Sequence, residues 1–265
     1  MKKTWIGVGV VCAVTLVSCG GGAEKTEAPK AAESASAPAG APAGGAGVPD
    51  EANGGTITGK VAFDGAKPTG KSIDMSANPV CMRAHSSSPQ KSEEVVINDN
   101  GTVKYAFVWI KSGLPDKTWT VPTTPVTLDQ SGCMYKPHVI GIMTGQNIEV
   151  KNSDPTNHNI HPQPTVNQDW NESQAPGSEA KMKTFPRQEV MIPVKCNIHP
   201  WMRSYIGVVS HPFFAVTGDD GTFTIKGLPP GTYTVQVWHE KYGTQDQTVT
   251  VGAKESKSQD FTLKG

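Results

Sequence analysis

The 265-residue sequence has no excess charge of either sign and no long apolar run. Its 24 Lys and Arg residues balance 24 Asp and Glu residues, so the formal net charge is zero. A neutral chain lacks the positive field that attracts a nucleic-acid backbone, and we expect no nucleic-acid partner. No apolar stretch reaches the roughly 20 residues that a membrane-spanning helix needs. The sequence therefore argues against a nucleic-acid-binding protein and against a protein that crosses a membrane by helices.

Aromatic residues are also few, at 7%, whereas the chain holds 28 glycines and 21 prolines. So many helix-breaking residues argue against a helical bundle and favour short strands joined by turns. Apolar and polar residues alternate in segments 56–63, 103–110, 146–151 and 232–237. In segment 103–110 both faces are apolar, which predicts a strand that is buried on both sides. The pattern predicts an all-β fold of the sandwich type.

The N-terminus has the pattern of a secretory signal peptide. Lys2 and Lys3 precede the apolar run 5–17. The run ends at Leu16-Val17-Ser18-Cys19, which resembles the lipobox of bacterial lipoproteins. The resemblance implies that the signal peptide is residues 1–18 and that Cys19 carries the lipid; an ordinary signal peptide is the alternative. We expect a lipid-anchored protein on the periplasmic side of a bacterial membrane, either the inner or the outer one.

Residues 19–53 consist mostly of Ala, Gly, Pro, Glu and Ser, with almost no large apolar side chain. Such a segment cannot bury enough apolar surface to offset the conformational entropy that folding removes. We therefore expect a disordered linker that tethers the folded part to the membrane surface.

One loop brings together three side chains that bind soft metals. Cys196 ends the alternating segment 190–196, and His199 and Met202 follow it at intervals of three residues. A thiolate, an imidazole and a thioether suit copper better than magnesium, calcium or a structural zinc ion. His158 follows the predicted strand 146–151 and supplies a second imidazole. At one end of a sandwich, His158, Cys196 and His199 with an axial Met202 would form a blue-copper site.

The same two segments resemble cupredoxins, and amicyanins most closely. The shared loop is Cys196-Asn197-Ile198-His199-Pro200-Trp201-Met202-Arg203, and the shared strand is His158-Asn159-Ile160-His161. The resemblance implies a cupredoxin-type Greek-key β-sandwich over residues 125–210 that holds one mononuclear copper ion. It further implies that His158 binds the metal, that His161 does not, and that Asn159 ties the two loops together.

The position of His199 in the loop predicts a ligand on the solvent side, through which electrons would pass. Ile198, Pro200 and Trp201 would surround it with an apolar patch. An exposed patch of this kind is typical of a docking surface for a partner. For Trp201, simple packing within the loop is the alternative.

A second module is predicted at the C-terminus. Residues 216–235 resemble the carboxypeptidase regulatory-like domain, a small transthyretin-like β-sandwich, and Asp220-Gly221 within them predicts a hairpin turn. The Gly-x-Val pattern at which that fold usually starts is matched near the N-terminus by Gly59-Lys60-Val61. We therefore expect residues 54–124 and 211–265 to be the N-terminal and C-terminal β parts of one small sandwich, with the cupredoxin domain inserted between them. Three consecutive small units are the alternative.

Cys81 and Cys133 are the cysteines that remain after the signal peptide, Cys19 and Cys196 are accounted for. An even pair in an oxidising compartment predicts a disulfide. A second metal site is the alternative, because His85 follows Cys81 and His138 follows Cys133 at short intervals.

These features predict an electron-transfer protein rather than an enzyme. A copper enzyme would need a further copper ion with an open position, usually held by three histidines, and the other histidines show no such cluster. Redox proteins such as c-type cytochromes, or a membrane redox complex, would be the partners, and the lipid anchor would hold the protein at the membrane. The alternatives are a copper-handling lipoprotein and a non-catalytic interaction module of a larger respiratory or redox complex.

Overall fold

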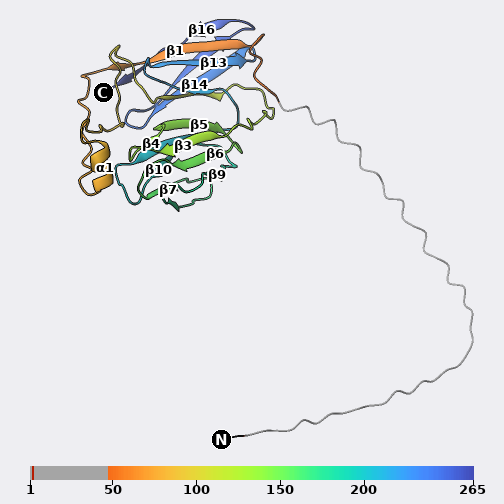
Figure 1. Ribbon diagram of the computed structural model, residues 1–265. Helices are drawn as coiled ribbons and strands as arrows, with labels where there is room; N and C mark the ends of the chain where they lie inside the picture. The colour runs from red at the N-terminus through yellow and green to blue at the C-terminus, as the bar shows by residue number, and fades with distance from the viewer. Residues whose placement is uncertain (1, 3–46) are drawn as a thin grey trace, which may run out of the picture. The chain divides into compact units, whose positions relative to one another are not determined.

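The computed structural model describes residue 2 and residues 47–265 (Figure 1). Apart from Lys2, the predicted signal peptide 1–18, the lipidation site Cys19 and the linker up to residue 46 lie outside the described residues. Residues 47–53 of the expected linker are described, and they hydrogen-bond to later parts of the chain: Gly47 N–H donates to the Thr118 carbonyl and Asp50 N–H to the Gly227 carbonyl. Among the residues that are described, no helix has the length and apolar character to cross a membrane.

Strands make up nearly all the regular structure between residues 47 and 265, which confirms the predicted all-β class. The elements in chain order are β1 (Gly55–Asp64), α1 (Pro79–Ala84), β2 (Phe107–Ser112), β3 (Val126–Gln130), β4 (Tyr135–Lys136), β5 (Val139–Met143), β6 (Ile148–Asn152), β7 (His158–Pro162), β8 (Glu172–Gln174), β9 (Lys181–Lys183), β10 (Glu189–Lys195), β11 (Arg203–Val209), β12 (Phe214–Val216), β13 (Thr222–Leu228), β14 (Gly231–His239), β15 (Gly243–Val251), β16 (Ser256–Ser258) and β17 (Phe261–Lys264).

One β-sandwich contains strands from both ends of the chain. Its first sheet has the order β13-β1-β16, with β17 also paired to β1, and its second sheet has the order β12-β2-β14-β15. Alternate residues point inward from each strand, so Ile57 of β1, Ile225 of β13 and Val235 of β14 share one core. In Figure 1, β1 in orange lies together with β13, β14 and β16 in blue.

The other β-sandwich comes from the middle of the chain. One sheet has the order β5-β11-β10-β7-β8, and the facing sheet has the order β4-β3-β6-β9. Their inward side chains meet in a separate core that includes Leu128, Val150, Ile192 and Ile206. Cys196 and Met202 belong to this same core, which places the predicted metal loop at its edge.

Strand β2 contributes to two cores at once, which confirms the prediction that this segment is buried on both sides. Val108 and Ile110 point into the first sandwich. Phe107 and Trp109 point the other way and pack against Val139, Met191 and Val209 of the second sandwich. The two sandwiches therefore stack through the outer faces of their sheets. The strand begins at Phe107 rather than at residue 103, because Tyr105 has a positive φ of 66° that breaks the extended backbone.

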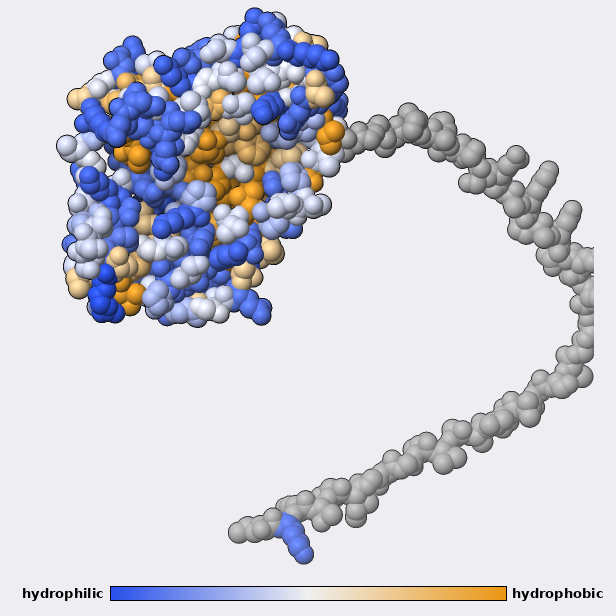
Figure 2. Space-filling model, turned by 45° about the horizontal axis from the view of Figure 1, so that its top comes forward, coloured by the Kyte–Doolittle hydropathy of each residue, from blue (hydrophilic) through white to orange (hydrophobic). Residues whose placement is uncertain are grey.

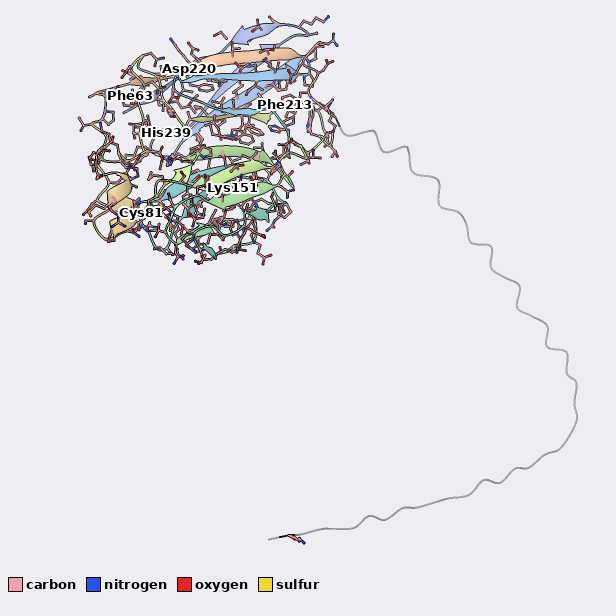
Figure 3. The ribbon with its side chains drawn as sticks, viewed as in Figure 1. Phe63, Cys81, Lys151, Phe213, Asp220 and His239 are labelled. Carbon is pink, nitrogen blue, oxygen red and sulfur yellow. A yellow bond between two sulfur atoms is a disulfide. The ribbon has the colours of Figure 1, made fainter. Side chains whose placement is uncertain are left out.

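Residues 73–85 do not form the β structure expected within 54–124. They contain α1 and pack beside the metal loop, where Met75 and Cys81 share a small apolar cluster with Cys133 and Met134. We call residues 73–85 the covering segment. The structure has a disulfide between Cys81 and Cys133, which ties this segment to the second sandwich (Figure 3).

Candidate metal centre

Three predicted ligands converge at one end of the second sandwich. One ring nitrogen of His158, one of His199 and the sulfur of Cys196 lie within 4.8 Å of one another. The Nδ1 atoms of the two histidines are 2.9 Å apart, and Cys196 Sγ is 3.7 Å from His199 Nδ1. Strands β7 and β10 bring them together, because these strands pair antiparallel and so place the start of β7 beside the loop after β10. All three side chains are buried.

Met202 closes the loop that carries Cys196 and His199. Its side chain is fully buried in the same core as Cys196. Its backbone N–H donates to the His199 carbonyl at 3.0 Å, and its carbonyl accepts from Cys196 N–H at 3.3 Å. These two bonds hold the loop in a tight turn, so Cys196 and His199 approach the same point from adjacent positions.

Asn159 links the two segments of the centre, as the resemblance implies. Its backbone N–H points at Cys196 Sγ at 3.4 Å, and its side-chain Oδ1 accepts from Asn197 N–H at 2.9 Å. The N–H of His199 also points at the same sulfur at 3.4 Å. Burial alone would raise the pKa of the Cys196 thiol, but the hydrogen bonds from His158 and from these N–H groups outweigh it and lower the pKa. The site therefore favours the thiolate, which is the form that binds metals.

Asp154 orients His158, and the sequence patterns did not single it out. Its Oδ2 lies 2.7 Å from His158 Nε2. The same carboxylate accepts from the backbone N–H groups of Gly132 and Cys133 at 2.6 and 2.7 Å. Burial raises the pKa of Asp154, but hydrogen bonds from His158 and these N–H groups outweigh it and keep the carboxyl ionised. With Nε2 directed to Asp154, Nδ1 is the ring nitrogen of His158 that faces the centre.

These residues fit a resident metal ion. Two imidazole nitrogens and a thiolate point at one small volume that is closed to solvent. Among the described residues, only His158 also belongs to a second group of possible metal-binding side chains. That other cluster joins His158 to Asp154 and Cys133, but Cys133 is held in the disulfide and offers no thiolate. A donor set of one thiolate and two imidazoles is soft and suits copper.

His199 does not lie on the solvent side, and that expectation is wrong. Its side chain is only 1% exposed. The Nδ2 atom of Asn78 is 2.7 Å from His199 Nε2, and Cys81 Sγ is 3.7 Å from the same nitrogen. Burial first, and then the charge of His158, lower the pKa of His199 to about 4. The covering segment lies over the imidazole because the disulfide fixes it there, and no local sequence pattern connects residue 78 to residue 199.

The three predicted docking residues are not equivalent. Ile198 is 47% exposed, and Pro200 is exposed beside it. Trp201 is half-buried, and its indole N–H donates to the Cys133 carbonyl at 3.0 Å. It packs against the core of the second sandwich and against the cluster under the covering segment. Trp201 thus packs within the loop, whereas Ile198 and Pro200 lie at the surface.

The other histidines lie apart from the centre. His161 faces Asp169 at 3.1 Å. His85 contacts the Gly132 carbonyl, and His138 is paired with Glu240. Because Cys81 and Cys133 form a disulfide, the alternative of a second metal site built on these cysteines is wrong.

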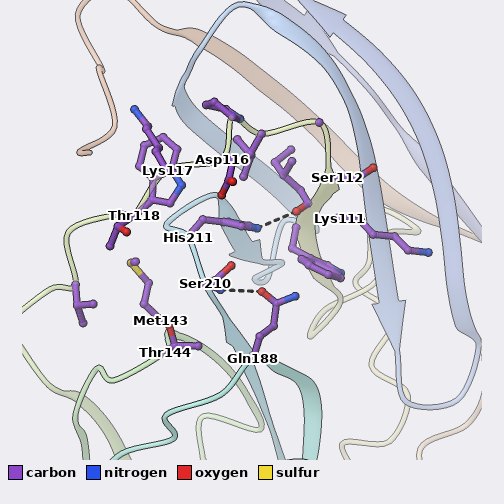
Figure 4. A pocket seen from close by; sticks show the side chains of 17 residues that line it. Lys111, Ser112, Asp116, Lys117, Thr118, Met143, Thr144, Gln188, Ser210 and His211 are labelled. Carbon is purple, nitrogen blue, oxygen red and sulfur yellow. Dashed lines mark hydrogen bonds between the residues drawn. The ribbon is translucent and has the colours of Figure 1, made fainter. Parts of the chain in front are cut away.

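A pocket of about 800 Å³ lies elsewhere on the molecule. Residues 109–119 line much of it, together with Met143, Gln188 and His211 (Figure 4). It contains none of the predicted ligands. The face seen in Figure 2 also carries an apolar area surrounded by hydrophilic residues. The candidate centre is thus a closed site, separate from the open surfaces of the molecule.

Comparison with known proteins supports the second module. The model of the carboxypeptidase regulatory-like domain matches residues 208–264, which confirms the expected regulatory-like module over these residues. No curated protein matches the chain.

Solved structures that resemble part of the chain include copper proteins. A copper-containing nitrite reductase from Thermus scotoductus SA-01 is 21% identical with a TM-score of 0.30, covering 37% of this chain and 25% of the reductase. A purple cupredoxin from Nitrosopumilus maritimus is 18% identical with a TM-score of 0.27, over 31% of this chain and 98% of its own. An amicyanin variant in the Cu(I) state is 19% identical with a TM-score of 0.29, over 38% of this chain and 97% of its own. This chain thus spans a quarter of the length of the reductase. The evidence for the candidate centre is the side-chain geometry of this chain.

Proposed function

We propose that the protein transfers single electrons through one type 1 (blue) copper ion held by His158, Cys196 and His199, with Met202 as the axial ligand. The observation that carries this proposal is the convergence of Nδ1, Nδ1 and Sγ in a buried pocket. An ion in such a soft donor set cycles between Cu(I) and Cu(II).

The residues of the chain support that chemistry in three ways. The β7 and β10 strands hold His158 and Cys196 in fixed positions through their pairing. The N–H groups of Asn159 and His199 point at the sulfur and stabilise its negative charge. The covering segment and the core exclude water from the ligands. A scaffold that changes little between oxidation states keeps the reorganisation on electron transfer small.

The proposed location and partners follow from the same features. We propose that the protein is a lipoprotein anchored through Cys19 on the periplasmic side of a bacterial membrane. The disulfide between Cys81 and Cys133 suits an oxidising compartment. The partners would be c-type cytochromes or a membrane redox complex, which would approach the exposed Ile198 and Pro200.

We propose no catalytic activity. The histidines of the described residues outside the centre contact a carbonyl, a carboxylate or the packed core, and they do not gather into a second three-histidine group. One observation favours an alternative function, that of a copper-handling lipoprotein. Asn78 and Cys81 of the covering segment contact His199 Nε2 and would hinder a redox partner from approaching this imidazole closely.

Electron exchange distinguishes the two functions. The copper-loaded, oxidised protein is mixed with a reduced c-type cytochrome, and both visible spectra are followed in a stopped-flow instrument. The proposal predicts that the protein bleaches as the cytochrome is oxidised in equal amount. Cys196→Ser serves as the control and should leave the cytochrome reduced. Tight copper binding without exchange at a range of ionic strengths would favour copper handling instead.

A further inference from the structure

One pair of residues closes the base of the loop 196–202, which carries three of the four proposed ligands. Lys195 of β10 and Arg203 of β11 face each other in the antiparallel pairing of these strands, directly before Cys196 and directly after Met202. The Arg203 side chain is exposed, so its backbone is the part of the residue that the fold can hold. A group that fixes the Arg203 backbone therefore also fixes the end of the loop at Met202.

The segment between β4 and β5 contacts the start of β11 at three successive residues. The Nδ1 atom of His138 lies 3.1 Å from the Arg203 carbonyl. The Ser204 hydroxyl donates to the Pro137 carbonyl at 3.2 Å, and the Tyr205 N–H donates to the His138 carbonyl at 2.9 Å. A carbonyl oxygen can only accept, so His138 Nδ1 must donate to Arg203. The ring of this buried histidine thus holds the base of the loop directly.

The other nitrogen of the His138 ring is held from the first sandwich. Its Nε2 lies 2.5 Å from Oε1 of Glu240, whose side chain is 9% exposed. Glu240 lies in the turn between β14 and β15, within residues 208–264, which we call the regulatory-like module. The turn is itself fixed, because the Lys241 N–H donates to Nδ1 of the buried His239. A hydrogen bond between an imidazole and a carboxylate is stronger than one between neutral groups.

A second carboxylate lies beside the same ring. Glu93, in the segment before β2, places Oε2 3.8 Å from His138 Nδ1, and its Oε1 accepts from the Tyr105 hydroxyl at 2.9 Å. The Oε2 atom is buried and makes no hydrogen bond, so the Arg203 carbonyl is the acceptor of the His138 Nδ1–H group. Glu93 therefore flanks the ring, whereas Glu240 binds it.

We propose that Glu240 and His138 are positioning residues through which the regulatory-like module holds the base of the ligand loop. Contacts run without a break from the Glu240 carboxylate through the His138 ring to the Arg203 carbonyl. The module is then part of the support of the copper centre rather than only a spacer. The effect on the metal rests on the proposed copper function, but the link itself can be tested in the metal-free protein.

The first test is backbone amide hydrogen exchange in the metal-free full chain. In Glu240→Ala the N–H groups of Cys196 and Met202 should exchange about tenfold or more faster than in the wild type, because the loop opens more easily once the charged hydrogen bond is lost. Glu240→Gln should restore the wild-type rates, since an amide can still hydrogen-bond to Nε2. Glu255→Ala removes another paired carboxylate of the module and is the control.

Loop amides that exchange at the wild-type rate in Glu240→Ala would overturn the proposal, even if this variant unfolds more readily in urea. Equal acceleration in Glu240→Ala and Glu255→Ala would also overturn it, because the effect would then be a general one of the module.

The second test is a double-mutant cycle on the affinity for Cu(I), measured by competition with a chelator. Glu240→Ala should bind Cu(I) about tenfold more weakly than Glu255→Ala, as is typical when an outer partner of a metal site is lost. His138→Phe keeps a ring but loses both hydrogen bonds, so adding Glu240→Ala to it should cause no further loss. A full further loss would show that Glu240 does not act through His138 and would overturn the proposal. A wild type that binds no Cu(I) would refute the copper centre, whereas the exchange rates would still decide the link.

Discussion

At the scale of single residues, the candidate centre contains groups that fix the predicted ligands in addition to the ligands themselves. Asp154 holds His158 through Nε2 and is itself held by two backbone N–H groups. Asn159 holds the Cys196 loop through Asn197. A ligand whose far side is fixed in this way presents its metal-binding atom in one direction.

Asp154→Asn tests this support. An amide has one acceptor oxygen, so it cannot serve both backbone N–H groups and His158 at the same time. We expect copper affinity to fall by about 10–100-fold, as is typical when the partner of a metal-bound histidine is lost. The measurement is a Cu(I) competition titration. Asp169→Asn, beside the non-ligand His161, is the matched control, and an equal loss in both variants would contradict the role of Asp154.

The candidate ligands could be proposed from the sequence because their pattern is local. Cys196, His199 and Met202 lie within seven residues of one loop, and the preceding alternation shows that Cys196 ends a strand. Asp154 lies four residues before His158 and was within reach of the same reasoning. Asn78 was not, because it meets His199 only through the tertiary fold, across 121 residues of sequence.

At the scale of elements, the covering segment is the main departure from expectation. Residues 54–124 were expected to supply strands, and β1 and β2 do so. The part between them contains α1, whose six residues are too few for a periodic pattern to show. Its position depends on Cys81, which is fully buried against Cys133.

The double variant Cys81→Ser/Cys133→Ser tests the contribution of this link. The disulfide joins residues 52 apart, and closing a loop of that size stabilises a fold by roughly 3–5 kcal/mol. We expect the free energy of unfolding, measured with urea, to fall by about that amount. The wild type treated with a reductant should behave in the same way. An unchanged unfolding midpoint in both would show that the segment is held by packing alone.

At the scale of the whole molecule, strands far apart in the sequence share sheets. β1 pairs with β13 and with β17, and β2 pairs with β14 and β12. The alternating pattern of each strand could be predicted because it depends on neighbouring residues. The stacking of the two sandwiches through Phe107, Trp109 and Met191 could not, because a continuous apolar run gives no sign of which surface covers it.

The stability of this packed molecule should depend on pH through two buried histidines that lie outside the candidate centre. Burial lowers the pKa of His211 to about 4, and burial with the nearby His138 charge lowers the pKa of His239 to about 4. The Nδ1 atom of His211 accepts the backbone N–H of Phe213, and the Nδ1 atom of His239 accepts that of Lys241. Protonation of either Nδ1 would therefore place two donors face to face.

The unfolded chain, with histidine pKa near 6.5, binds more protons than the folded chain between about pH 6.5 and 4. The free energy of unfolding should therefore be highest above pH 6.5. It should fall as the pH is lowered through that window, by roughly 2–3 kcal/mol for each histidine. Urea unfolding at a series of pH values measures this. His211→Gln should flatten the profile, and a wild-type profile that is level from pH 7 to 4 would contradict the assignment.

The central claim is that His158, Cys196 and His199 hold one copper ion. The most direct measurement is a titration of the metal-free protein with Cu(II), followed by visible absorption. The account predicts an intense blue colour, from charge transfer between the Cys196 thiolate and copper, that saturates at one equivalent and is absent from a folded Cys196→Ser variant. A wild type that stays colourless, or a Cys196→Ser variant that turns equally blue, would contradict it.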